Sequence, residues 1–356
     1  MKIYTNFFSQ RKCHQQSKKS STKERREQSL SQSTTDSDVC CSETDTAEIL
    51  ETRESGPRAQ QGSSLALEER WSTDRMVQVA ELWKLGQEEQ AKLGELQPRI
   101  ADIDHWKNDP FEAVYFLLEK KWNIDKAESL FRDVHKWRMT EGVDEILDTY
   151  QPDPLFNYFP NAILRGVDYE GSPVHLERPG ICDSLGFYQR FGEDGVFRHA
   201  VYLRELDTRG SWHQAYQREH GRRVTKITMI IDLQGLSRDQ LMRPALISLM
   251  GRILRLGDEM YPPLSKRIIV LRAPRMFKAL WSMTQNFLQD EVKERIIFST
   301  ENDYLQVIDR YMDRSVLPPC ICPDEGKGEG TLGFENVQWE GGKLSDIETR
   351  LADAQE

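Results

Sequence analysis

Three short apolar segments separated by helical patterns constrain the fold of this chain more than any other feature. The segments are residues 224–232, 267–272 and 295–300, which are rich in β-branched side chains and apolar on both faces, as buried strands are. Residues 243–256 and 274–288 lie between them and carry apolar side chains at helical spacing. Alternating strands and helices predict a mixed, largely parallel sheet with covering helices, and therefore an α/β fold.

The region before these segments divides into a helical part and a hairpin. Asp109 with Glu112, and Asp125 with Glu128, have the spacing of reciprocal helix caps, and Pro110 suits a first helical turn. Residues 71–150 are therefore expected to form a helical N-terminal subdomain. Residues 162–168 and 174–178 alternate in polarity around a Gly-Ser-Pro turn, which predicts a β-hairpin. A single long helix is expected from about residue 194 to residue 220.

Both ends of the chain are predicted to lie outside the folded core. Residues 1–70 are rich in Ser, Thr, Gln and Glu and contain too little apolar surface to offset the loss of chain entropy, so we expect disorder. Residues 1–30 contain eight Lys or Arg and two Glu. This composition favours a basic tail, with an organelle transit peptide as the alternative. Residues 321–356 are acidic and Gly-rich and are expected to form a tail, which leaves 151–320 as the main domain.

Composition excludes several classes of protein. The net charge of −10 argues against a nucleic-acid partner. Six scattered cysteines indicate a reducing compartment and no disulfide framework, and the pair Cys320 and Cys322 lacks the further ligands of a zinc site. The chain has neither an apolar run long enough to span a membrane nor a secretory signal. We therefore expect a cytoplasmic protein without metal or cofactor.

Catalytic motifs are absent from the sequence. It contains no glycine-rich nucleotide loop, no nucleophile elbow and no zinc-protease motif. His175 lies in an alternating strand pattern, where a structural role is favoured, and Asp232 ends a strand in a turn that Asp and Gly commonly shape. We therefore do not expect an enzyme.

The charge and apolar pattern of the C-terminal half point to a membrane surface. Residues 224–300 contain twelve Lys or Arg and seven Asp or Glu in an otherwise acidic chain. Each basic group near an anionic membrane contributes on the order of 1 kcal/mol. Residues 274–288 are amphipathic and rich in Met and aromatic groups, which suits either a helix that covers a core or one at a bilayer surface. By pattern alone, the core-covering helix is favoured.

Five loose motifs in a fixed order add a resemblance. They are a helical segment at 116–138, the strand entry at 168–178, the turn at 231–237, a long block at 260–298, and Leu-Pro-Pro at 317–319. Together they resemble the CRAL-TRIO lipid-binding family over roughly residues 95–320.

This resemblance implies a CRAL-TRIO fold, in which a sheet floors an apolar pocket that a mobile gate helix closes at the membrane. It shifts the interpretation of residues 274–288, called the gate segment below, toward a membrane contact. The gate and pocket candidates are Phe277, Leu280, Trp281, Phe287, Ile227, Met229 and Ile231. A closed pocket would shelter an acyl chain whose exposure to water costs about 0.8 kcal/mol per CH₂.

The resemblance also implies headgroup-binding candidates, namely Lys120, Lys121 and Arg295. Phosphoinositide binding rests on these three residues alone, because Val292 replaces a hydrogen-bonding Thr of the family. Apolar Ile227 and Met229 stand where family members cradle choline phosphate, so phosphatidylcholine is disfavoured and a neutral apolar ligand fits as well. For Lys120 and Lys121, an exposed helix end is the equal alternative.

The expected function is therefore binding of a phospholipid or other small hydrophobic ligand, with transfer or presentation at membranes and peripheral membrane association. The alternative is a regulatory protein-interaction module of the same fold that transfers no lipid, with a protein partner on the N-terminal segment. An empty apolar cavity of several hundred Å³ would count against that alternative.

Overall fold

The computed structural model describes residues 66–221, 223–241, 243–261, 265–277, 281–282, 285–288, 290–327, 331 and 337–353. Side chains are described for these residues except 239, 241, 258, 287 and 291. The predicted disordered segment 1–70 lies outside this set except for its last five residues, where helix α1 (Leu67–Arg70) is found.

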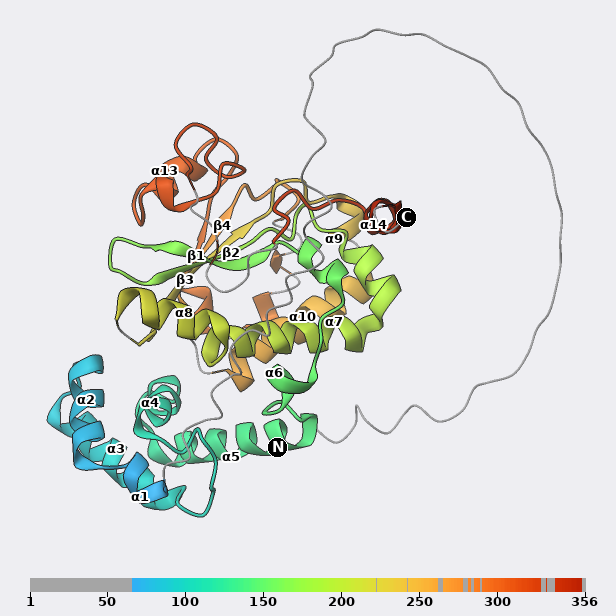
Figure 1. Cartoon of the computed structure of the whole chain (residues 1–356). Coiled ribbons are helices and arrows are strands. Elements are labelled where there is room, and N and C mark those ends of the chain that lie inside the picture. The colour runs from blue at the N-terminus through green and yellow to red at the C-terminus, as the bar shows by residue number, and fades with distance from the viewer. Residues whose placement is uncertain are drawn as a thin grey trace, which may run out of the picture. The chain divides into compact units, whose positions relative to one another are not determined.

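A five-stranded sheet forms the centre of the α/β domain, as predicted. Its strands are β1 (Asn161–Val167), β2 (Pro173–Glu177), β3 (Ile227–Asp232), β4 (Ser265–Leu271) and β5 (Ile296–Phe298), in that spatial order. The β1–β2 hairpin is antiparallel, and β2 to β5 run parallel. Figure 1 shows α7 (Ser184–Thr208), α8 (Ser211–His220) and α10 (Pro244–Arg255) along one face of this sheet, with α13 (Tyr304–Ile308) on the other.

The two faces of the sheet bury different side chains, because side chains alternate along a strand. One face packs beneath α13 and the segment after it, in a core that includes Leu176, Ile230 and Ile269. The opposite face turns Ile227, Met229 and their neighbours toward α7 and α8. These strands were expected to be apolar on both faces, and the structure confirms that expectation.

Helices α2 (Thr73–Trp83), α3 (Gln87–Arg99), α4 (Pro110–Glu119) and α5 (Ile124–Glu141) share one core before the sheet begins. Asp109 caps α4 by accepting a hydrogen bond from Phe111 N at 2.9 Å. The reciprocal cap from Glu112 is wrong, since its carboxylate pairs with Lys107 (3.0 Å) and Arg223 (2.7 Å). A charged partner attracts a carboxylate more strongly than a backbone amide does.

The expected start of α5 is also wrong, because Asn123 rather than Asp125 caps it through a bond from Lys126 N at 3.0 Å. Likewise, the single long helix expected at 194–220 is two helices, α7 and α8, with Gly210 between them. Gly192, at φ 72°, also kinks α7.

Shorter elements connect these parts. They are α6 (Ile146–Thr149), η1 (Pro154–Tyr158), α9 (Arg238–Leu241), the π-helical turn η2 (Leu256–Met260), η3 (Gln285–Phe287), α12 (Asp290–Lys293) and η4 (Arg314–Val316).

The C-terminal stretch differs from the expected acidic tail. It contains helix α14 (Leu344–Asp353), and Leu344 and Ile347 are buried there against η1 and the first turns of α7. Leu344, Ile347 and Leu351 recur at helical spacing, which provides an apolar stripe even though the surrounding composition is polar.

Candidate functional site

A cavity of about 380 Å³ lies between the sheet and its covering helices. Its floor is the sheet face formed by Ile227, Met229, Ile231, Ile268, Val270 and Ile296. Its opposite wall is α10, which contributes Leu246, Ile247, Leu249, Met250, Ile253 and Leu254. These apolar side chains cannot hydrogen-bond water, so the transfer of an apolar ligand from water into such a space is favourable.

The gate segment lies at the margin of this cavity. Phe277, Trp281 and Leu288 line the cavity, and so does Val292 just beyond the segment. Of the remaining gate candidates, Leu280 is outside the described residues and the side chain of Phe287 is not described. The structure thus brings five of the seven gate and pocket candidates to one cavity: Ile227, Met229, Ile231, Phe277 and Trp281.

Three aromatic rings connect the gate segment to the edge strand β5. The ring centroid of Phe298 lies 5.1 Å from that of Trp281 and 5.7 Å from that of Phe277. Phe298 is 41% exposed, as is Met276. Large apolar side chains that are both exposed and contiguous are a feature of interaction sites. Phe298 is not among the residues predicted from the sequence, because its exposed position depends on β5 being the edge strand.

One of the basic candidates, Arg295, lies near a lysine that was not predicted from the sequence. Lys226 precedes β3, and burial, together with the positive charge of Arg295, lowers its pKa to about 8, while Glu119 opposes this shift. Lys120 Nζ lies 3.6 Å from the Glu119 carboxylate. Lys120 and Lys226 therefore both lie near the Glu119 carboxylate, and Arg295 lies near Lys226; these three cations are called the basic group below.

Lys121 differs from the other two sequence-predicted basic residues. It is exposed at the end of α4 and has φ 51°, in the left-handed region that a residue other than Gly adopts at a cost of roughly 1–2 kcal/mol. The following Trp122 is in the same region, at φ 61°. This turn directs the chain from α4 into α5.

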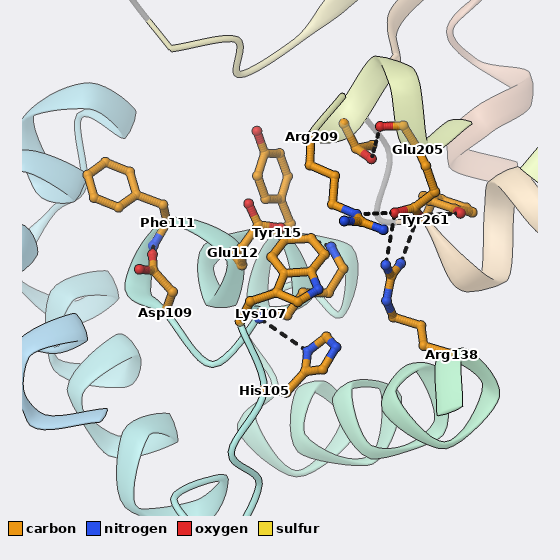
Figure 2. Close-up of polar contacts among 12 residues, drawn as sticks. His105, Lys107, Asp109, Phe111, Glu112, Tyr115, Arg138, Glu205, Arg209 and Tyr261 are labelled. Carbon is orange, nitrogen blue, oxygen red and sulfur yellow. Dashed lines mark hydrogen bonds and ion pairs between the residues drawn. The ribbon is translucent and has the colours of Figure 1, made fainter. Parts of the chain in front are cut away.

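A buried polar network joins the helical part to the cavity wall (Figure 2). The fully buried Arg138 of α5 donates two hydrogen bonds of 2.9 Å to the fully buried Glu205 of α7. Tyr261, which lines the cavity, donates to the same carboxylate at 2.5 Å, and Arg209 also bonds to it. The Arg138 charge lowers the pKa of Glu205 against the effect of burial, so the carboxylate is ionised.

Two residues weighed as catalytic candidates have structural partners. Asp232 accepts hydrogen bonds from Arg178 and from Arg272, at 2.6 to 2.9 Å. His175 is buried in β2 and hydrogen-bonds Asn161. Within the described part of the chain, no group of three His, Cys, Asp or Glu side chains could hold a metal ion. In the same residues, no helix has the length and apolar content to cross a bilayer.

These features define an α/β protein with an internal apolar cavity, the class that takes up hydrophobic ligands. Residues 161–320 match the CRAL/TRIO domain family, so the protein contains a CRAL-TRIO domain with the expected fold.

Similar proteins extend the comparison. "Protein real-time" of Anopheles gambiae is 27% identical over 236 residues, which are 65% of this chain and 34% of that protein. "Protein real-time" of Drosophila melanogaster is 27% identical over 243 residues, 67% of this chain and 36% of that protein. The phosphatidylinositol/phosphatidylcholine transfer protein SFH7 of Arabidopsis thaliana is 27% identical over 242 residues, 65% of this chain and 43% of that protein.

The chain thus spans less than half the length of these relatives. The crystal structure of Sfh5 has the same fold, with a TM-score of 0.51 and 12% identity over 80% of this chain and 99% of that one.

Proposed function

We propose that this protein binds a phospholipid or other small hydrophobic ligand in the cavity and transfers or presents it at membranes. The observation that carries the proposal is the cavity of about 380 Å³, whose floor and opposite wall are apolar. A space of this size and lining favours an apolar guest over water. The name of the Arabidopsis relative, a phosphatidylinositol/phosphatidylcholine transfer protein, agrees with this class of ligand.

The gate segment would control exchange and make the peripheral membrane contact. Phe277 and Trp281 line the cavity, and the adjoining Met276 and Phe298 are each 41% exposed. Exposed aromatic and Met side chains insert into the boundary between headgroups and acyl chains. A displacement of this segment toward the bilayer would then open the cavity directly into the lipid phase.

The basic group and Lys121 would hold the phosphate of an anionic membrane lipid. Lys226 and Arg295 are adjacent in sequence to Ile227 and Ile296, which line the cavity, so a phosphate there would lie beside the apolar space. Arg is a suitable phosphate partner because its guanidinium donates several hydrogen bonds in a fixed geometry.

Lipid extraction tests the proposal. The full chain is incubated with vesicles that contain labelled neutral and anionic lipids, then separated from them, and its lipid content is measured. We expect folded protein to carry lipid away, and Ile268→Trp, which fills the cavity floor, to carry much less. Lys120→Ala with Lys121→Ala should reduce phosphoinositide uptake and spare neutral lipids. Folded protein that extracts no lipid class would refute the proposal and favour the regulatory interaction module.

A further inference from the structure

Helix α14 packs on the outside of one wall of the cavity. Leu344 and Ile347 are buried in an apolar cluster that α14 forms with η1 and the first part of α7. Three members of the same cluster, Phe159, Phe187 and Val196, also line the cavity. This cluster, called the aromatic wall below, therefore has the cavity on one side and α14 on the other. None of its residues belongs to the gate segment.

The start of α14 is fixed by a turn and by one carboxylate. Gly341 has φ 64°, and a Cβ at this position would lie 2.5 Å from the carbonyl oxygen of Ile181, so only glycine suits the close approach. The carboxylate of Asp183 accepts hydrogen bonds from Gly186 N at 2.8 Å and from Leu344 N at 3.1 Å. One side chain thus caps α7 and also holds the first residue of α14.

The rest of α14 is held by few contacts. Seven of its ten side chains are exposed. Its ion pair between Glu348 and Arg190, at 3.1 Å, is solvent-exposed, and such pairs contribute little to stability. Elements with few buried apolar contacts open at a lower free energy than the core of a protein does. An isolated helix of ten residues is also unstable in water, so a released α14 would lose its helical structure.

We propose that α14 is a strap on the cavity: when docked it holds the aromatic wall closed, and when released it lets Phe187 turn outward and opens a second route to the ligand. The inference rests on the proposed function and adds a means of regulating it. Docking of α14 and occupancy of the cavity are then linked, and each must favour the other by the same factor.

The rate at which a ligand leaves the cavity tests the strap. The full chain is loaded with NBD-labelled stearate and mixed with vesicles whose rhodamine-labelled lipid quenches the NBD fluorescence. Release through the gate segment requires membrane contact, so its rate rises with vesicle concentration. Release past the strap occurs in water, so it determines the rate extrapolated to zero vesicle concentration.

Ile347→Ala should raise this extrapolated rate. Removal of a buried Ile side chain corresponds to a change of about 30-fold or more in the ratio of docked to released α14. We therefore expect the rate at zero vesicle concentration to increase at least about tenfold. Leu351→Ala, at a partly buried position of the same stripe, should raise it about threefold or more, and it serves if Ile347→Ala does not fold.

Two control variants separate release of the strap from other effects. Thr349→Ala changes the exposed face of α14 and should leave the extrapolated rate within about twofold. Leu93→Ala removes a fully buried side chain from the core of the helical part, far in sequence from the aromatic wall. It should lower stability but leave the extrapolated rate within about threefold, which shows that loss of stability alone does not open the cavity.

Hydrogen exchange of the unmodified chain provides a second readout. Without ligand, the amides of residues 345–353 should exchange faster than those of β3, because α14 opens without unfolding of the sheet. Saturation with NBD-labelled stearate should slow the α14 amides at least about threefold, since the ligand supports the aromatic wall from inside.

The outcomes distinguish the strap from the function on which it rests. An unchanged extrapolated rate in Ile347→Ala, or α14 amides whose exchange does not slow with ligand, would overturn the strap and leave a ligand-binding cavity. Folded protein that takes up neither NBD-labelled stearate nor any lipid from vesicles would refute the proposed function, and the strap with it.

Discussion

The buried ion pair between Arg138 and Glu205 allows the structure to be tested by measuring what one contact contributes to stability. Both side chains are fully buried and share two hydrogen bonds of 2.9 Å, across 67 positions of sequence. Breaking a buried pair by removing one partner costs about 3–5 kcal/mol, since the remaining charge stays in a low-dielectric interior. Glu205→Gln should lie near the lower end, about 3 kcal/mol, because Asp144 still pairs with Arg138 at 2.6 Å.

Urea unfolding of the full chain at pH 7, followed by circular dichroism, measures this loss. Arg138→Met and Glu205→Leu complete a double-mutant cycle. We expect the double variant to lose at least about 2 kcal/mol less than the sum of the two single losses, because neither charge is then left without its partner.

The same variants should weaken ligand binding in the cavity, because Tyr261 lines the cavity and donates its hydroxyl hydrogen bond to Glu205. A loss below about 1 kcal/mol for Glu205→Gln, or strictly additive single losses, would refute this account of the contact.

Three further predictions concern other elements. Burial lowers the pKa of His199 from 6.5 to about 3, so its neutral form is favoured on folding and stability should fall as pH drops below 6.5. The loss should reach about 2 kcal/mol at pH 5. In urea unfolding at several pH values, His199→Phe should remove this part of the dependence of stability on pH. Phe retains the ring stack on Phe156. An unchanged dependence of stability on pH would contradict the prediction. Ile347→Ala should destabilise the protein by roughly 2–4 kcal/mol in the same assay, whereas a solvated tail would give no measurable change. Because the pKa of Lys226 is about 8, sedimentation with phosphoinositide vesicles should weaken between pH 7 and 9, and Lys226→Arg should abolish that dependence; equal pH dependence in both proteins would exclude Lys226.

Local patterns predicted the elements well where one periodicity dominated. The hairpin and the three parallel strands follow from runs of β-branched residues bounded by turns, and the sheet forms as expected. Helix starts were less predictable. Asn123 and Asp125 are both good capping residues, and the choice between them depends on where α5 is free to begin after the left-handed turn at Lys121 and Trp122.

Some residues of the candidate site were also predictable from the sequence, and others were not. The apolar floor was expected from the family resemblance, and alternation places residues 227, 229 and 231 on one face of a strand. Lys226 and Phe298 could not be selected from the sequence, since one is half-buried by the helical part and the other is exposed only because β5 is an edge. The expected tail contains a packed helix because α7 and η1 provide a matching apolar surface.

The sequence by itself determined the order of strands and helices and the apolar character of both sheet faces, because side-chain periodicity acts between near neighbours in the chain. Only the tertiary structure decided which charges lie in the interior. Arg138 meets Glu205 from 67 positions away, and Asp207 of α7 meets His175 of β2. The free energy of a buried charge depends on its spatial partners, and these were settled only when distant segments packed together.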